Sequence, residues 1–211
     1  MREIGLFNPG TVLTRLFLLR HGRAALPDGR RRFIGRTDPP LAPGGVEEAT
    51  AAGRAIVKLP FDRMVSSDLQ RARRTAEEVA RFVKLPVRLN PCLREIDLGG
   101  WEGLEVEAVK RDHPEAYEAR GLDFEGFRPP GGESFGDLSN RALPFLLELA
   151  TFPGNVLVVG HSGVFRVFMA SVLGISIRQA FLLRQDTGSF HVLSGRAGKL
   201  AVERLNWKSA F

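Results

Sequence analysis

The sequence contains a single cysteine, Cys92, among its 211 residues. One cysteine excludes an intrachain disulfide and any structural zinc site built from several cysteines. No apolar run reaches the roughly 18 residues expected of a membrane-spanning helix, because Glu148 and Arg166 interrupt the two best candidates. A signal-peptide pattern is also absent, since the apolar run 16–19 is short and no small-residue cleavage site follows it. We therefore expect a cytoplasmic enzyme or binding protein with no membrane partner.

The chain has fewer acidic than basic residues, 24 Asp and Glu against 30 Lys and Arg, for a net charge of +6. Two explanations of this positive charge are equally good. Either the basic surface only keeps the protein in solution, or it attracts anions such as nucleic acid, anionic lipid or phosphorylated metabolites. No zinc finger, helix-turn-helix or RNP motif accompanies the basic residues, which argues against nucleic acid. Most of the cations are arginines, whose guanidinium forks suit bidentate phosphate contacts.

Short apolar runs alternate with segments of helical spacing along most of the chain. We predict strands at 12–19, 61–66, 86–89 and 155–160, and a hairpin from 189–194 and 199–205. Predicted helices cover 43–59, 68–83 with Asp68 as the N-cap, 104–112, 133–149 and 163–173. Pro144 lies inside one of these helices and is expected to kink or end it.

This alternation predicts an α/β fold, a three-layer sandwich with a mostly parallel central sheet and helices on both faces. The length fits one domain, residues 1–211. The segments at about 22–42 and 98–132 are rich in loops and are expected to form a small cap over the carboxyl ends of the strands. Sheets of this kind bind their ligands at those ends.

Two of the four histidines lie directly after predicted strands. His21 follows the first strand, between Arg20 and Gly22, and His161 follows the strand at 155–160 where a helix begins. Arg71 lies in the first turn of the helix after the second strand. Each residue alone has an ordinary explanation, as a structural histidine or a solvated arginine. Together they converge on one edge of the sheet and predict a common site.

A histidine among arginines is suited to phosphoryl transfer. A neutral imidazole nitrogen can attack phosphorus and form a phosphohistidine, which water then hydrolyses. Nearby guanidinium groups disfavour protonation of the imidazole and bind the phosphoryl oxygens. Backbone N–H groups at the helix start, around Ser162, can donate further hydrogen bonds to the phosphoryl oxygens. The departing alkoxide needs a proton, and Glu95 is the best donor because its segment should pack near the sheet edge. Asp97 and Glu102 stay open as alternatives, and Glu95 could instead pair with Arg94.

These residues resemble the histidine phosphatase superfamily, in the branch that includes phosphoglycerate mutases, over almost the whole chain. The resemblance rests on residues 20–22 and on the segments 35–45, 66–76, 95–103, 131–134 and 158–163. The segments 35–38 and 130–134 also look like those of the α-ribazole phosphate phosphatases of cobalamin assembly.

The resemblance implies a phosphomonoesterase that hydrolyses a small phosphorylated metabolite through a phosphohistidine, without a metal or an organic cofactor. It implies His21 as the nucleophile, Glu95 as the proton donor and later the base, and His161 as part of the catalytic group. The candidate phosphate ligands are Arg20, Arg71, His161 and Ser162, and Arg23 and Gly35 are candidates for binding the rest of the substrate. A homodimer is the assembly that we consider.

One departure from the family pattern follows the nucleophile motif. The family often has an acidic or amide residue and then Thr or Ser, where this chain has Arg23 and Ala24. Arg23 either contacts a second anionic group of the substrate or points into solvent. The lost hydroxyl keeps a phospho-ligand-binding regulator without turnover as an alternative, and a mutase, which a short cap disfavours, is the other. His113 and His191 lie outside the motifs, and we expect them on the surface and in a strand.

Overall fold

The computed structural model describes residues 13–196 and 198–208. Its six-stranded sheet has the order β3-β2-β4-β1-β5-β6. The strands are β1 (Leu13–Arg20), β2 (Arg63–Ser66), β3 (Arg88–Leu89), β4 (Gly154–Gly160), β5 (Phe190–Arg196) and β6 (Lys199–Trp207). The first four pair in parallel, whereas β5 runs antiparallel to both β1 and β6. The predicted mostly parallel sheet and the C-terminal hairpin are therefore confirmed.

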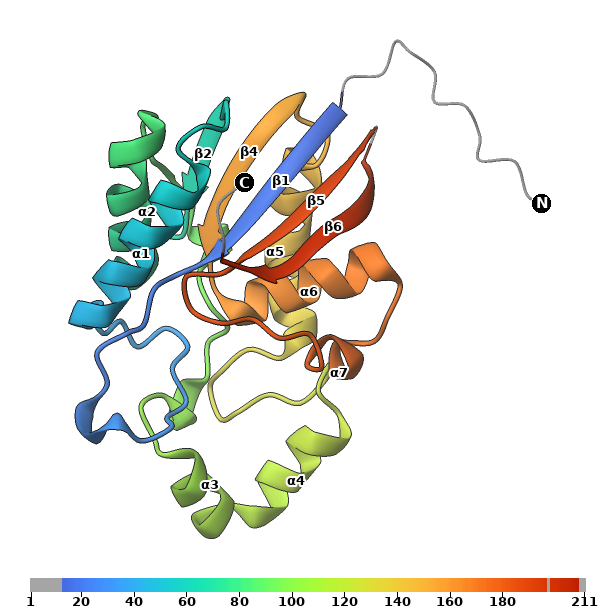
Figure 1. Cartoon of the computed structure of the whole chain (residues 1–211). Coiled ribbons are helices and arrows are strands. Elements are labelled where there is room, and N and C mark those ends of the chain that lie inside the picture. The colour runs from blue at the N-terminus through green and yellow to red at the C-terminus, as the bar shows by residue number, and fades with distance from the viewer. Residues whose placement is uncertain (1–12, 197, 209–211) are drawn as a thin grey trace.

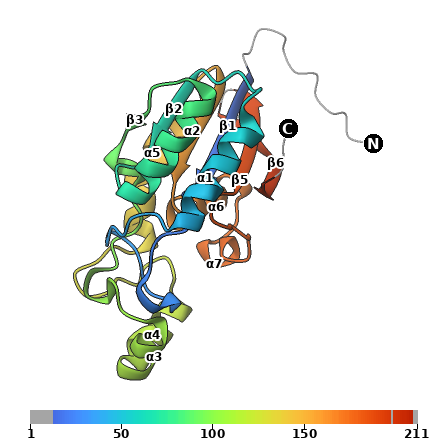
Figure 2. The ribbon, with the colours of Figure 1, turned by 60° about the vertical axis from the view of Figure 1, so that its left-hand side comes forward.

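Helices cover both faces of this sheet, with α1 and α2 on one face and α5 and α6 on the other (Figure 1 and Figure 2). The α-helices are α1 (Pro43–Ile56), α2 (Gln70–Val83), α3 (Val106–Asp112), α4 (Pro114–Leu122), α5 (Phe135–Leu149), α6 (Ser162–Leu173) and α7 (Ile177–Ala180). Short 3-10 turns occupy Pro27–Gly29, Pro91–Leu93 and Gly99–Trp101. The sheet and the helical layers on its two faces form the predicted three-layer sandwich.

The uninterrupted apolar run in β1 is explained by burial on both faces of the sheet. Leu16 and Leu18 pack with α5 and α6, whereas Phe17 and Leu19 pack with α1 and α2. All four are fully buried. Successive strand residues point to opposite faces, so a central parallel strand between two helical layers must be apolar at every position. The two helical layers therefore hold the central strands in place, and with them the positions of the residues that follow the strand ends.

The two predicted cap segments, 22–42 and 98–132, lie beyond the carboxyl ends of β1 and β4, with α3 and α4 outermost (Figure 1). The segments are joined to each other, because the Phe33 amide donates to the Leu104 carbonyl and the Gly103 amide donates to the Phe33 carbonyl. Trp101 is buried between the rings of Phe33 and Phe127, whose centroids lie 5.2 and 5.4 Å from its own. This packing joins the two segments to each other beyond the strand ends.

Several local expectations differ from the structure. Asp68 is not the N-cap of α2, because Leu69 holds that position and the Asp68 carboxylate accepts hydrogen bonds from Arg94 instead. Helix α5 continues through Pro144, and a helix that was not predicted, α4, follows α3. The first residue of the first predicted strand, Val12, lies outside the described residues. None of the helices in the described part of the chain is long and apolar enough to cross a membrane.

Candidate active site

Neighbouring strand ends bring the two histidines together. His21 follows β1 and His161 follows β4, and the last residues of these parallel strands, Arg20 and Gly160, are paired in register. The His21 amide donates to the Gly160 carbonyl at 3.0 Å, and the two imidazole centroids lie 5.0 Å apart. The predicted convergence at one sheet edge is therefore observed.

The hydrogen bonds of His21 define its tautomer. Nδ1 lies 2.7 Å from the Gly22 carbonyl oxygen, which can only accept, so Nδ1 carries the proton. Nε2 keeps its lone pair and accepts from Nε of Arg71 at 3.4 Å. Burial lowers the pKa of His21 well below its usual value, and the cations of Arg71 and Arg20 lower it further, against the opposing effect of the Gly22 carbonyl. The imidazole is therefore neutral at physiological pH, with Nε2 available as a nucleophile.

Arg71 is held rigidly beside His21. The residue is fully buried, and its two terminal nitrogens donate to the carbonyl oxygens of Thr37 at 2.9 Å and Gly35 at 2.6 Å. Arg20 donates to the Gln185 carbonyl, and its Nε is buried without a hydrogen-bond partner among the described residues. Two fixed guanidinium groups therefore flank the imidazole.

His161 lies beside His21 and has no exposed surface. Its Nε2 is 2.9 Å from Oγ of Ser67, and its Nδ1 is buried without a partner in the described part of the chain. Burial lowers the pKa of His161 well below its usual value, and the cation of Arg71 lowers it further. His161 is therefore a second neutral imidazole within reach of the first.

A cavity of about 310 Å³ opens in front of His21. Its lining consists of Arg20, His21, Arg23, Ala24, Leu26, Arg32, Ile34, Arg71, Glu95, Ser162 and Thr187. Glu95 is the only carboxylate in that lining. Three predicted phosphate ligands thus share one cavity with the predicted nucleophile and proton donor.

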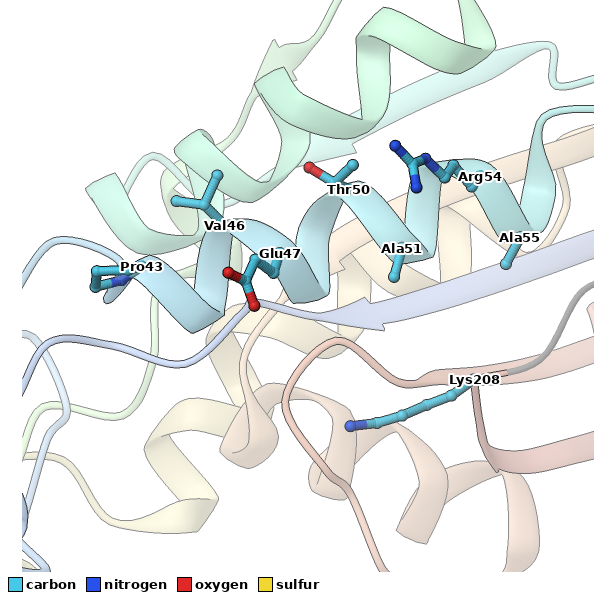
Figure 3. Close-up of a pocket in the computed structure, with 8 residues that line it drawn as sticks. All are labelled: Pro43, Val46, Glu47, Thr50, Ala51, Arg54, Ala55 and Lys208. Carbon is cyan, nitrogen blue, oxygen red and sulfur yellow. The ribbon is translucent and has the colours of Figure 1, made fainter.

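A larger hollow of about 820 Å³ lies elsewhere, between one side of α1 and Lys208, which follows β6 (Figure 3). Its lining contains the charged side chains of Glu47, Arg54 and Lys208 but no histidine. None of the residues that line the His21 cavity lines this hollow. We therefore assign the candidate site to the smaller cavity.

The structure distinguishes the three candidate proton donors. Glu95 lines the cavity, and its Oε2 accepts from the Gly163 amide at 2.9 Å and lies 3.4 Å from Oγ of Ser162. The carboxylate of Glu102 instead accepts from the amides of residues 35–37 and of Leu98. Asp97 accepts from the Gly99 amide and pairs with Arg36 at 3.4 Å. Of the three, only Glu95 faces the space where a substrate would lie.

The remaining predicted residues have distinct surroundings. Ser162 lines the cavity at the start of α6. Arg23 lines the cavity mouth with 69% of its side chain exposed, and its Nη2 lies 3.4 Å from the Glu48 carboxylate. Gly35 lies behind Arg71 rather than in the cavity lining. A Cβ at Gly35 would come within 2.1 Å of the Ile96 carbonyl oxygen, so the position requires glycine for close packing.

Sequence reasoning missed the contribution of the loop before β5. Gln185 provides the carbonyl that accepts from Arg20, and Thr187 lines the cavity. No periodic pattern or motif distinguishes these residues, because only the return of the chain beside β1 brings them to the site. Within residues 13–196 and 198–208, no three His, Cys, Asp or Glu side chains are grouped as they would be to hold a metal ion.

A sequence profile of the histidine phosphatase superfamily (branch 1) matches residues 16–208. The chain belongs to this superfamily. One relative, the adenosylcobalamin/alpha-ribazole phosphatase of Escherichia coli strain K12, is 32% identical over 182 residues, which cover 85% of this chain and 89% of the relative. The glucosyl-3-phosphoglycerate phosphatase of Mycolicibacterium vanbaalenii is 34% identical over 175 residues, 77% of this chain and 76% of the relative.

A phosphatase of known structure has the same fold. The crystal structure of the alpha-ribazole phosphatase from Shigella flexneri superposes with a TM-score of 0.84 at 28% identity and covers 93% of this chain and 98% of that one. The family and the fold predicted from the sequence are therefore confirmed, and so is the resemblance to the α-ribazole phosphatases within it.

Proposed function

We propose that this histidine phosphatase is a phosphomonoesterase that transfers the phosphoryl group of a small metabolite to His21 and then to water. The observation that carries the proposal is the state of the His21 imidazole. Its Nδ1 is protonated against the Gly22 carbonyl, and its Nε2 lone pair lies beside Arg71 in a cavity that contains one carboxylate, Glu95. Family membership and relatives that are named phosphatases of small metabolites support the same reaction class.

In the first step, Nε2 of His21 attacks phosphorus and the bond from phosphorus to the ester oxygen breaks. Arg20 and Arg71 hold the phosphoryl oxygens, whose charge must be stabilised through the transition state. Their backbone partners fix both guanidinium groups before substrate arrives. His161 and Ser162 complete the group of phosphate ligands in this proposal.

The protonated carboxyl of Glu95 gives its proton to the departing oxygen, so the leaving group departs as a neutral alcohol. The resulting carboxylate is held by the Gly163 amide. In the second step it takes a proton from water as the water oxygen attacks the phosphohistidine. The products are inorganic phosphate and free His21, and Glu95 is protonated again.

Hydrolysis of para-nitrophenyl phosphate tests the proposal. We expect turnover by the wild-type protein and a fall in kcat of about a thousandfold or more in His21→Ala, because the nucleophile is lost. His113→Ala is the matched control, since His113 is exposed and lies outside the cavity lining. Absence of turnover across a broad panel of phosphate esters would favour the non-catalytic regulator instead. Exchange of phosphate between phosphoglycerates, primed by bisphosphoglycerate, would favour the mutase.

We further propose that the chain is a single domain whose segments 22–42 and 98–132 act as the cap over the site. Its partner in this proposal is the small phosphorylated substrate, with no nucleic acid and no organic cofactor or metal. Phosphorylated metabolites are charged and stay in the compartment that makes them, so we propose the cytoplasm as its location. A homodimer is the proposed assembly, and light scattering of the purified protein tests it.

A further inference from the structure

A second chamber of about 390 Å³ adjoins the His21 cavity. The two share four lining residues, Arg32, Ile34, Glu95 and Ser162. Glu95 is the proposed proton donor, so the ester oxygen must lie close to it when the bond breaks. The chamber therefore lies on the side where the rest of the substrate, its leaving group, extends away from phosphorus.

The chamber combines aromatic rings with arginines. The rings are Phe33, Tyr117, Phe124, Phe135 and Phe181, and the arginines are Arg31, Arg32, Arg120 and Arg166. Glu95 is the only carboxylate in its lining. The arginine Arg32 is neutralised from outside by Asp28 and Glu105, at 3.0 and 3.1 Å. A leaving group there would meet apolar surface together with cations that the chamber itself does not neutralise.

Arg166 is one of these unneutralised cations. It follows Ser162 by one turn of α6, so both residues face the site. Its guanidinium lies 4.4 Å from the centroid of the Phe181 ring. Its Nε is buried and has no hydrogen-bond partner among the described residues. Stacking on a ring occupies the face of a guanidinium and leaves the N–H groups at its edge free to bind an anion.

Arg120 reaches the same chamber from α4 in the cap. Its guanidinium lies 4.9 Å from the centroid of Phe124. The Phe124 and Phe181 rings are in contact, with centroids 4.6 Å apart, so the two stacked arginines sit on one pair of rings. In the described part of the chain, neither Arg120 nor Arg166 has a carboxylate within ion-pair distance. Each is therefore a positioned cation without an ion-pair partner among the described residues.

The protein surroundings of these two arginines disfavour their charged forms. Burial lowers the pKa of both arginines, and the neighbouring cations of Arg20 and Arg120 lower that of Arg166 further, against the attraction of Glu95. Charged groups that leave water without a partner raise the energy of the folded state. An anion that enters from solvent would relieve this cost at both positions.

We propose that the leaving group of the natural substrate carries a second anionic group, a carboxylate or a phosphate, that binds Arg166 and Arg120 in this chamber. The anion is attached to an apolar or aromatic part that packs on the rings of Phe124 and Phe181. This inference rests on the proposed function, because it assigns the specificity of the same site. Arg166 and Arg120 are therefore specificity residues, separate from the arginines that hold the transferred phosphoryl group.

Isosteric pairs of aryl phosphates test the inference. We compare para-carboxyphenyl with para-carbamoylphenyl phosphate, and the two meta isomers in the same way, because each pair differs in charge and hardly in shape. For at least one pair, the wild-type protein should hydrolyse the carboxylate with a kcat/KM about tenfold higher or more, through a lower KM, since hydrogen bonds to charged groups are the stronger ones. Arg166→Gln and Arg120→Gln should each reduce this preference to about twofold or less, with a smaller effect on the amide.

Arg178→Gln is the matched control, because it removes an exposed arginine that lines neither cavity. Calorimetry with para-carboxybenzylphosphonate and para-carbamoylbenzylphosphonate, ester analogues that cannot be hydrolysed, gives the same comparison without turnover. Equal affinity for the acid and the amide, or an equal loss of both in the arginine variants, would overturn the inference. Tighter binding of the acid by a protein that hydrolyses none of the esters would uphold it and contradict the phosphatase function instead.

Discussion

At the residue scale, the proposed chemistry depends on the environment of one imidazole, that of His21. The sequence predicts that His21, Arg71 and His161 meet, because each follows a strand of one parallel sheet. It does not predict which nitrogen of His21 is free, since the Gly22 carbonyl determines that through local backbone geometry. The sequence also left the choice of proton donor open, because the environment of each carboxylate depends on distant backbone amides. The carboxylate of Glu102 accepts hydrogen bonds from such amides, whereas the carboxylate of Glu95 lines the cavity.

Glu95→Gln tests the donor at this scale. The amide keeps the size of the side chain but has no proton to give to a departing oxygen. We expect kcat for an alkyl phosphate, a poor leaving group, to fall by about a hundredfold or more, and kcat for para-nitrophenyl phosphate to fall far less. Glu118→Gln, an exposed change in the cap, should leave both rates unchanged. An equal loss with both substrates would remove Glu95 from the role of donor.

The pH dependence of kcat/KM tests the electrostatic role of Arg71. Because burial and the Arg71 cation lower the pKa of His21, the nucleophile stays neutral below pH 6.5, and wild-type activity should persist there. Arg71→Gln removes one of these causes, so the pKa of His21 rises and the acid limb moves to higher pH. Arg73→Gln, on the exposed side of the same helix, should leave the limb in place. An unmoved limb in Arg71→Gln would contradict this role.

At the scale of structural elements, the Glu102 carboxylate joins the two cap segments. Hydrogen bonds from Thr37 and from the backbone of Leu98, Thr37 and Arg36 outweigh its burial and lower the pKa of Glu102, so it stays charged. The loop that it holds provides the Gly35 and Thr37 carbonyls that fix Arg71. Glu102 is therefore a positioning residue for Arg71, the proposed phosphate ligand, although it does not line the cavity.

Glu102→Gln tests this chain of contacts. The amide nitrogen cannot accept a hydrogen bond, so at least one buried backbone amide loses its partner, and the free energy of unfolding should fall by about 1–3 kcal/mol. Because the loop carbonyls behind Arg71 become less fixed, KM for para-nitrophenyl phosphate should rise by about threefold to tenfold. Glu107→Gln, an exposed change in α3, should alter neither quantity. A loss of stability with no change in KM would show that Glu102 acts on stability alone.

The same scale shows where prediction of elements from sequence succeeds. The central strands and their flanking helices were predicted because their apolar periodicity reflects burial on the two faces of the sheet. Asp68 was misassigned because its ion pair with Arg94, 26 residues later, outweighs local capping. Pro144 was expected to disturb α5, but Pro144 and Asn140, whose carbonyl loses its helical partner, are both exposed, so water can satisfy that carbonyl.

At the scale of the whole molecule, several of the many arginines gather around the site. Arginines line both cavities at the edge of the sheet, and one carboxylate, Glu95, faces them. The basic composition fits an anionic ligand and a merely solubilising surface equally well, and it does not predict the second chamber. Its rings and cations come from the cap, from the first residue of α5, from α6 and from the segment after α7, and only the fold brings these parts together.

The stability of the molecule should depend on pH through a buried histidine outside the site. Burial lowers the pKa of His191 in β5 to about 4, and the Arg166 cation adds to the shift. In the unfolded chain, His191 therefore takes up a proton near pH 6.5. In the folded protein, the same residue takes up this proton only near pH 4. Stability falls as the pH falls through that window, by about 2 kcal/mol between pH 7 and pH 5 from this residue.

Urea unfolding of His191→Asn at the two pH values measures that contribution. We expect the variant to lose less stability between pH 7 and pH 5 than the wild type, because the titrating group is gone while an acceptor for the Asn206 amide remains. His113→Asn, at an exposed position, should keep the wild-type dependence. The same pH dependence in His191→Asn as in the wild type would contradict the assignment.

Identification of the phosphorylated residue tests the central claim most directly. The protein is mixed rapidly with excess para-nitrophenyl phosphate, quenched in denaturant at alkaline pH, where phosphohistidine survives, and digested for mass spectrometry. We predict one phosphoryl group on His21, bonded to Nε2, and none in His21→Ala. A phosphoryl group on His161 or on any other side chain during turnover, with His21 unmodified, would contradict the account.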